Sequence, residues 1–246
     1  MSTVAQPVAV FRGPQQPNTD IEGKLAELEG LLRSIADEFK TVRLASSLAA
    51  EDNVLFDAIS RLGLPIAAFS LDTLRLNAET LAVVPALAAR YGQTVELIQP
   101  RPEAVERFVA THGLDAIYDS VALRKNCCDI RKVEPLGRAL ADADAWLTGQ
   151  RRTQSATRAD LAVRETDAAH AATKFNPLAD WSEADVWTYV RRFDVPVNEL
   201  HHRGYPSIGC APCTRAISIG EEIRAGRWWW EDPANKECGL HVGNRV

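Results

Sequence analysis

TVRLASSLAAED, residues 41–52, is the stretch that decides the expected fold. Residues 41–47 have the pattern of a strand, and a helix is predicted over residues 52–62. A strand that runs directly into a helix is the repeating unit of a parallel α/β sheet. The junction SSLAAED, residues 46–52, is therefore expected at the carboxyl end of a strand, where such sheets bind their ligands.

The same alternation of strand and helix continues along the chain. Short apolar runs predict further strands at residues 66–71, 94–98 and 145–149. Apolar residues at helical spacing predict further helices at residues 21–39, 78–91, 103–111 and 182–193. The predicted fold class is therefore α/β, with a mostly parallel central sheet flanked by helices, as in adenine-nucleotide-binding folds.

Three parts are expected along the chain. Residues 1–19 are rich in Pro and Gln, and this composition predicts a disordered leader. Residues 20–220 carry the α/β pattern and the candidate binding residues. Residues 221–246 form a C-terminal tail.

Composition narrows the class of ligand. The chain has 246 residues, 46% of them hydrophobic and 25% charged, which suits a globular protein with a core. It has no run of roughly 20 apolar residues and no basic-then-apolar N-terminus, so we expect a cytoplasmic protein without a membrane partner. A net charge of −5 speaks against nucleic acid, while 22 of the 28 basic residues are arginine, which suits a small anion. A homo-oligomer is compatible with this composition.

Cysteine usage predicts a metal centre. Five cysteines without a secretion signal argue against a disulfide framework. They comprise two close pairs and one residue near the C-terminus, namely Cys127 with Cys128, Cys210 with Cys213, and Cys238. Adjacent cysteines are unusual in structural zinc sites, so a [4Fe-4S] cluster is favoured over zinc. The alternative is that the first pair belongs to the core and the second is a redox dithiol.

Three loops after predicted strands should line one crevice: residues 46–52, 71–76 and 148–158. The first combines Ser46 with a helix N-terminus, which favours an anion; an ordinary serine N-cap is the alternative. The third carries Arg151, Arg152 and Arg158, which match phosphate or sulfate; a solvated basic loop is the alternative.

These loops resemble those of assimilatory adenylyl-sulfate reductases. The resemblance extends to five further stretches: KNCCDIRKVEPL, FNPLADWSEADVW, GCAPCTRA, GEEIRAGRWWWE and the terminal KECGLH. Members of this family are thioredoxin-dependent sulfonucleotide reductases related to PP-loop pyrophosphatases, and the resemblance covers residues 40–246. It implies a [4Fe-4S] cofactor and the reduction of adenylyl sulfate to sulfite and AMP. The two cysteine pairs are typical of members that use the unphosphorylated nucleotide.

The resemblance also implies roles for individual residues. The cluster ligands would be Cys127, Cys128, Cys210 and Cys213. Cys238, the remaining thiol, would attack sulfur and form an S-sulfonate that thioredoxin or glutaredoxin resolves. Lys132 is expected between the cluster and the sulfate. The expected substrate contacts are Ser46, Asp52, Thr73, Lys132, Gly149, Arg151, Arg152, Arg158, Arg224, Arg227 and His241.

Two features of the sequence qualify this resemblance. The family usually has glycine at Leu74 and histidine at Asn77, and a residue other than glycine at position 74 constrains the loop backbone. The tryptophans at 228–230 cannot all face one way, so they form either a docking hinge or a buried last turn.

Three other functions stay open. The first is reduction of 3′-phosphoadenylyl sulfate. The second is tRNA thiolation by a PP-loop enzyme, for which a basic RNA-binding face and a glycine-rich ATP loop would be expected and neither is apparent. The third is a non-catalytic metal-binding scaffold, which leaves the terminal KECGLH unexplained.

Overall fold

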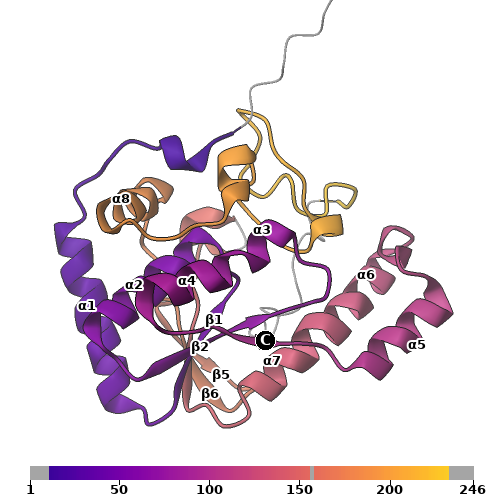
Figure 1. Cartoon of the computed structure of the whole chain (residues 1–246), viewed down its shortest axis with the longest axis horizontal. Coiled ribbons are helices and arrows are strands. Elements are labelled where there is room, and N and C mark those ends of the chain that lie inside the picture. The colour runs from indigo at the N-terminus through magenta and orange to yellow at the C-terminus, as the bar shows by residue number, and fades with distance from the viewer. Residues whose placement is uncertain (1–10, 156–157, 233–246) are drawn as a thin grey trace, which may run out of the picture.

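The computed structural model describes residues 11–155 and 158–232. Its centre is a six-stranded sheet in the order β3-β2-β1-β4-β6-β5, in which only the β5–β6 pair is antiparallel among these described strands. The strands are β1 Val42–Ser46, β2 Ile66–Leu71, β3 Glu96–Ile98, β4 Ala145–Leu147, β5 Arg164–Asp167 and β6 Ala172–Phe175. The predicted α/β class with a mostly parallel sheet is confirmed (Figure 1).

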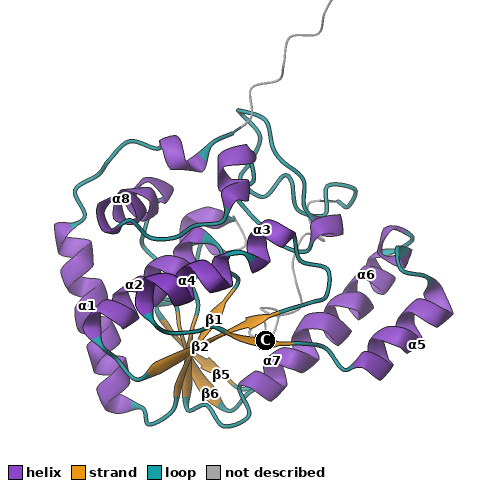
Figure 2. Cartoon of the chain, viewed as in Figure 1, coloured by secondary structure: helices purple, strands orange, loops and turns teal. Residues whose placement is uncertain are grey.

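Helices surround the sheet, as Figure 2 shows by the purple ribbons around the orange strands. They are α1 Glu22–Glu38, α2 Ala50–Leu62, α3 Ala78–Leu81, α4 Val83–Tyr91, α5 Pro102–His112, α6 Val121–Cys128, α7 Glu134–Ala139 and α8 Glu183–Phe193. A π-helical turn, Asp129–Val133, joins α6 to α7 without a break. Cys127 and Cys128 therefore lie where a helix changes its hydrogen-bond pattern, a feature common at functional sites.

Differences from the predicted elements are local. The helix predicted over residues 78–91 is two helices, α3 and α4, separated at Ala82. Helix α6 and the hairpin of β5 and β6 were not predicted. Both are short, and β5 has the sequence RETD without an apolar residue, so neither shows an apolar period.

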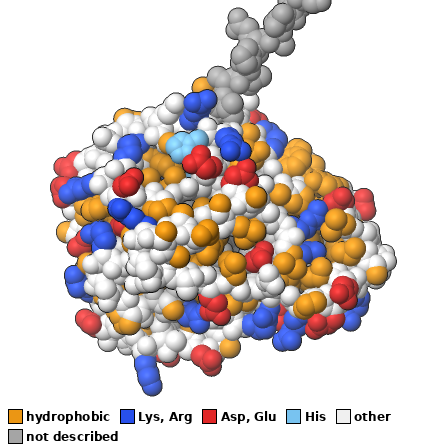
Figure 3. Space-filling model, viewed as in Figure 1, with side chains coloured by type: hydrophobic (Ala, Val, Ile, Leu, Met, Phe, Trp, Pro, Cys, Tyr) orange, Lys and Arg blue, Asp and Glu red, His pale blue; other side chains and the backbone are white. Residues whose placement is uncertain are grey.

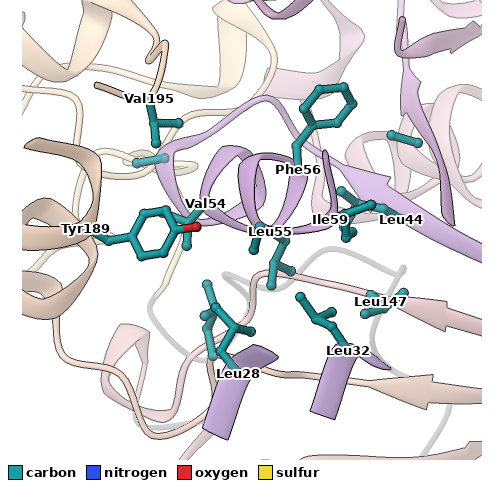
Figure 4. Packing of buried hydrophobic residues seen from close by; sticks show 14 of the residues in the cluster. Leu28, Leu32, Leu44, Val54, Leu55, Phe56, Ile59, Leu147, Tyr189 and Val195 are labelled. Carbon is teal, nitrogen blue, oxygen red and sulfur yellow. The ribbon is translucent and has the colours of Figure 1, made fainter. Parts of the chain in front are cut away.

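The main hydrophobic core surrounds α2. Figure 4 shows Leu55 and Ile59 of this helix close to Leu28 and Leu32 of α1, and Leu44 contributes from β1. Every residue of α2 from Ala50 to Ile59 is buried. The core therefore fixes the first turn of α2 against the carboxyl edge of the sheet.

A second core lies on the other face of the sheet. It packs Phe69 of β2 and Trp146 of β4 against Leu136 of α7 and Leu140. Because α7 continues the helix that carries the cysteine pair, this packing also fixes the position of Lys132 in the π-helical turn.

The segment before α1 packs against the body of the protein. The Thr19 hydroxyl donates to Asp185 over 2.7 Å, Arg191 donates to the Pro14 carbonyl over 2.9 Å, and both Asp185 and Arg191 belong to α8. Residues 11–19, predicted to belong to a disordered leader, are therefore tied to α8. Residues 1–10 lie outside the described part of the chain.

Charge on the visible surface is mixed. On the face shown in Figure 3, acidic and basic side chains are interspersed, without a broad field of one sign. Within the residues that the structure describes, no helix has the length and apolar character to span a membrane.

Candidate functional site

The turn between β1 and α2 has an unusual backbone. Leu48 is fully buried and has a φ of 63°, in the left-handed region that favours glycine. Its N–H donates to the Ser46 hydroxyl over 3.0 Å. The N-cap of α2 is Ala49, which has no side chain that caps the helix. The alternative of an ordinary serine N-cap is therefore wrong, and an anion at this helix end would meet backbone donors.

Asp52 ties the loop after β1 to the loop after β4. Its carboxylate accepts from the Ser47 N–H over 2.7 Å, from the Ser47 hydroxyl over 2.5 Å and from the Gly149 N–H over 2.8 Å. Burial raises the pKa of Asp52 to about 6, although the hydrogen bonds from Ser47 and Gly149 act in the opposite direction. A Cβ at Gly149 would lie 2.6 Å from the Asp52 carboxylate, so glycine is required for this close approach.

A cavity of about 220 Å³ opens at this edge of the sheet and is hereafter called the sheet-edge cavity. All three predicted loops line it, together with a C-terminal segment between residues 206 and 228 and with Lys132 and Leu136. The expected substrate contacts that line it are Ser46, Asp52, Thr73, Lys132, Gly149, Arg151, Arg158, Arg224 and Arg227. The prediction that these loops form one crevice is confirmed.

Two of the arginines predicted to bind substrate are paired with carboxylates. Arg151 is buried and donates to Glu51 over 3.0 and 2.8 Å. Burial opposes ionisation of Glu51, but the Arg151 guanidinium lowers its pKa overall. Arg152 does not line the cavity; its guanidinium donates to Asp180 and to the Leu161 carbonyl. The expectation of a substrate contact from Arg152 therefore has no support in this geometry.

Arg227 faces the cavity with neutral neighbours. Its guanidinium donates to the Ser207 hydroxyl over 3.4 Å and to the Ile208 carbonyl over 3.2 Å. It lies so close to the backbone of Gly209 that a Cβ there would be 2.6 Å from its Cζ. Arg227 is thus held in place without a carboxylate among these partners, which suits a cation that serves a ligand.

The two cysteine pairs, separated by more than 80 positions in the sequence, converge on one pocket. This cysteine pocket is lined by Arg75, Ile117, Arg124, Cys127, Cys128, Arg131, Lys132, Cys210, Pro212, Cys213 and Trp228. Cys127 is partly exposed and the other three cysteines are buried. The prediction that the pairs meet is confirmed.

Cationic and hydroxyl groups surround these thiols. The Thr73 hydroxyl lies 3.2 Å from the Cys210 sulfur, and Arg131 bonds to the Thr73 carbonyl over 2.8 Å. Arg131 also hydrogen-bonds to Cys127. Burial raises the pKa of the free Cys213 thiol to about 11. Two of the four cations that line the pocket have carboxylate partners, Arg75 in Asp115 and Arg124 in Glu231. The four convergent cysteines themselves are the donor set that fits a centre held by thiolates.

Over residues 11–155 and 158–232, no set of three or more His, Cys, Asp or Glu side chains is placed to hold a single metal ion. The four cysteines share one pocket, and a four-iron cluster takes one thiolate at each iron.

Lys132 and Trp228 join the two pockets, because each lines both. Trp228 is 1% exposed, and its ring lies 4.8 Å from the Arg124 guanidinium and 4.6 Å from that of Arg227. Its φ of 40° is rare for a bulky residue. Trp229, in contrast, is 39% exposed. Of the three tryptophans, Trp228 alone is buried, so the burial interpretation holds for this residue and not for the whole run.

Sequence reasoning missed Arg124, Arg131 and Trp228 as parts of the cysteine pocket. The only available signal was the position of the two arginines on either side of the cysteine pair in RKNCCDIR. The predicted nucleophile Cys238 and the predicted contact His241 lie outside the described residues.

The fold and these two pockets define a class of protein: an α/β protein that binds an anionic, nucleotide-like ligand beside a thiol-rich centre. Residues 41–216 match the phosphoadenosine phosphosulfate reductase domain family, and the chain belongs to this family.

Its relatives agree with this assignment. The chain is 59% identical to adenosine 5′-phosphosulfate reductase of Burkholderia cepacia over 223 residues, which are 91% of this chain and 89% of that protein. It is 54% identical to the protein of the same name from Allochromatium vinosum over 211 residues, 86% of this chain and 82% of that protein. A crystal structure of phosphoadenylyl-sulfate reductase from Candida auris matches with a TM-score of 0.66 at 29% identity, covering 80% of this chain and 94% of that one.

Proposed function

We propose that this chain reduces adenylyl sulfate to sulfite and AMP in sulfate assimilation, with electrons from thioredoxin. As a member of its family, the chain is an oxidoreductase that acts on a sulfonucleotide. The relatives at 59% and 54% identity support the unphosphorylated substrate. The observation that carries the proposal is the wall shared by the sheet-edge cavity and the cysteine pocket, with Lys132 in both.

In this proposal the phosphosulfate group binds in the sheet-edge cavity. Ser46 and the α2 N-terminus supply neutral donors, and Arg158, Arg224 and Arg227 supply positive charge. Asp52 holds two of the loops together through Ser47 and Gly149. Fixed cations in a closed site stabilise the charge that develops on the leaving phosphate more strongly than mobile solvent does.

The chemical step is assigned to Cys238. Its thiolate attacks the sulfur of adenylyl sulfate, and the bond between that sulfur and the bridging oxygen breaks. AMP leaves with the electron pair of the broken bond, and Cys238 carries an S-sulfonate. In this proposal Lys132, which lines both pockets, neutralises the sulfonate oxygens. His241, nine positions after Asp232 in the predicted tail, is proposed as a further substrate contact.

Sulfite release requires a second thiol from outside the chain. The other four cysteines are assigned as ligands, so a thiolate of reduced thioredoxin or glutaredoxin attacks the Cys238 sulfur. Sulfite leaves with the electron pair, and the partner's second thiol resolves the mixed disulfide. The partner thereby supplies both electrons.

The four cysteines are proposed to hold a [4Fe-4S] cluster. The supporting observations are the convergence of both pairs and the four cations around them. When bound, the cluster would supply a structural cross-link and an electrostatic contribution beside the sulfate. Residues 20–220 would form the nucleotide- and cluster-binding domain, and residues 221–246 the catalytic tail of a cytoplasmic enzyme.

Steady-state kinetics without oxygen test this function. Protein purified anaerobically and given reduced thioredoxin should use adenylyl sulfate with a kcat/KM at least about a hundredfold above that for the 3′-phosphorylated form. An equal or reversed ratio would assign the chain to the 3′-phosphoadenylyl-sulfate reductases, the activity named for the Candida auris protein. Turnover of neither nucleotide would favour a non-catalytic scaffold.

A further inference from the structure

A buried ion pair links the cysteine-bearing helix to the last described residues of the chain. Arg124 of α6 donates through Nε and Nη2 to the two carboxylate oxygens of Glu231 over 2.9 and 2.7 Å. The side chains are 0% and 3% exposed. Such a pair is costly to break from one side, because the remaining charge stays buried without compensation.

Arg124 also touches two other parts of the site. It hydrogen-bonds to Cys128, one turn further along the same helix. Its guanidinium lies 4.8 Å from the ring of Trp228, which lines both pockets. A single buried cation thus contacts a proposed cluster ligand, the wall of the sheet-edge cavity and the C-terminal segment.

The backbone between Arg227 and Glu231 is fixed at the same place. The Trp228 N–H donates to the Cys213 carbonyl over 3.2 Å, and the Glu231 N–H donates to the Trp228 carbonyl over 2.9 Å. This turn is therefore held by Cys213 on one side and, through Arg124, by Cys128 on the other. The backbone around Trp228 cannot act as a hinge while these contacts persist.

We infer that Arg124 is a positioning residue that joins Cys128 to Glu231 and fixes the point from which the chain continues to Cys238. The inference rests on the proposed role of Cys238 as nucleophile. Cys238 lies seven positions after Glu231, and seven extended residues span at most about 25 Å, so the position of Glu231 limits where the thiol reaches. The packing of Cys128 in the cysteine pocket thereby helps to fix the position of Glu231, from which the chain continues to Cys238.

Hydrogen exchange tests the link between Arg124 and Glu231, hereafter called the clamp, without reference to activity. In Glu231→Gln the peptide covering residues 227–231 should exchange at least about tenfold faster than in the wild type, because the carboxylate no longer compensates Arg124. Glu38→Gln is the matched control: Glu38 accepts two hydrogen bonds from Arg164 in an exposed pair, and exchange at residues 227–231 should stay unchanged. Equal exchange in Glu231→Gln and wild type would overturn the inference.

A double variant separates positioning from folding. Arg124→Met with Glu231→Leu replaces the pair by apolar side chains of similar size, a change that proteins often tolerate. AMP affinity should stay within about twofold of the wild type, while turnover should fall about tenfold because the thiol samples a larger volume. Unchanged turnover in this variant would contradict a positioning role.

Coupling to the cysteine pocket has its own test. Cys128→Ser should also raise exchange at residues 227–231, since Arg124 loses its contact with the Cys128 sulfur; unchanged exchange would refute the coupling. If the wild type forms no S-sulfonate, the proposed function fails, whereas the exchange experiments still decide whether the clamp exists.

Discussion

The sheet-edge cavity and the cysteine pocket share a wall but are built differently. The cavity is lined by loops that follow β1, β2 and β4, so the parallel sheet places them together. The cysteine pocket is assembled from the end of α6, the π-helical turn and the irregular segment that contains Cys210 and Cys213. The first follows from the fold class, whereas the second depends on particular long-range contacts.

Their polar side chains differ as well. In the sheet-edge cavity, Arg151 already has a buried carboxylate partner in Glu51, and Asp52 has three hydrogen-bond donors. In the cysteine pocket, Arg124 likewise has a buried carboxylate partner in Glu231, but the pocket also gathers thiols whose pKa values burial raises, as at Cys127 and Cys213. The cavity is therefore organised by its own ion pairs and hydrogen bonds, while the cysteine pocket holds four thiols of the kind that a metal centre would use.

The largest expected effect separates the two pockets outright. Cys210→Ser should remove iron and abolish sulfite production, because a hydroxyl is a poor ligand for iron. AMP should still bind within about tenfold of the wild-type affinity, since the loops after β1 and β4 do not depend on Cys210. Iron analysis and calorimetric titration with AMP check this. Full activity in the iron-free variant would refute the cluster assignment.

Two arginines of the sheet-edge cavity should respond differently to the same substitution. Arg151→Leu leaves the buried Glu51 carboxylate without its guanidinium partner and should lower the free energy of unfolding by about 3–5 kcal/mol. Arg227→Leu removes a cation whose described partners are neutral oxygens, so it should instead raise the KM for adenylyl sulfate about 10–100-fold with a smaller loss of stability. Urea unfolding and kinetics on both variants measure the contrast, and the reverse pattern would contradict it.

The pH dependence of stability should reveal Asp52. Its pKa of about 6 in the folded chain lies above the ordinary 3.8, so the folded chain keeps a proton that the unfolded chain has lost. The stability contributed by Asp52 is therefore present at low pH and lost as pH rises through about 6. Asp52→Asn cannot ionise and should gain about 2 kcal/mol relative to the wild type between about pH 4.5 and pH 7. A difference independent of pH in urea unfolding would count against the shifted pKa.

The smallest expected effect concerns the loop after β2. Leu74 has a φ of 58° and is 51% exposed, so it adopts a left-handed backbone without the compensation of burial. Leu74→Gly should stabilise the protein by about 0.5–1 kcal/mol, because relief of the strain exceeds the extra entropy of unfolded glycine. Thermal melting would show this as a small rise in Tm; a fall would mean that the Leu74 side chain makes a stabilising contact.

Local sequence patterns predicted much of the fold and part of the site. The strand-to-helix junction around Ser46 and Asp52 was predictable because apolar periodicity and topology together place it at the sheet edge. Leu74 was identified from a missing glycine, and its positive φ agrees with that argument. The pairing of Arg152 with Asp180 was not predictable, since no local pattern distinguishes a paired arginine from one that faces a ligand.

The parts that were missed depend on distant contacts. Arg124 and Glu231 are 107 positions apart, and nothing in either segment alone indicates that they meet. The same holds for Trp228, whose burial between Arg124 and Arg227 follows from the packing of three separate segments. These residues form the boundary between the two pockets, where local sequence patterns carry the least information about which side chains meet.

The central claim is that Cys238 acts on a nucleotide bound beside the cysteine pocket, and mass spectrometry after a single turnover tests it most directly. Wild-type protein mixed with adenylyl sulfate without thioredoxin should release about one AMP per chain and gain one sulfonate on the peptide that contains Cys238. Reduced thioredoxin should then remove that group as sulfite. Cys238→Ser should keep its iron and its AMP affinity but form no adduct. An adduct on another cysteine, or turnover by Cys238→Ser at a rate comparable to the wild type, would contradict the account.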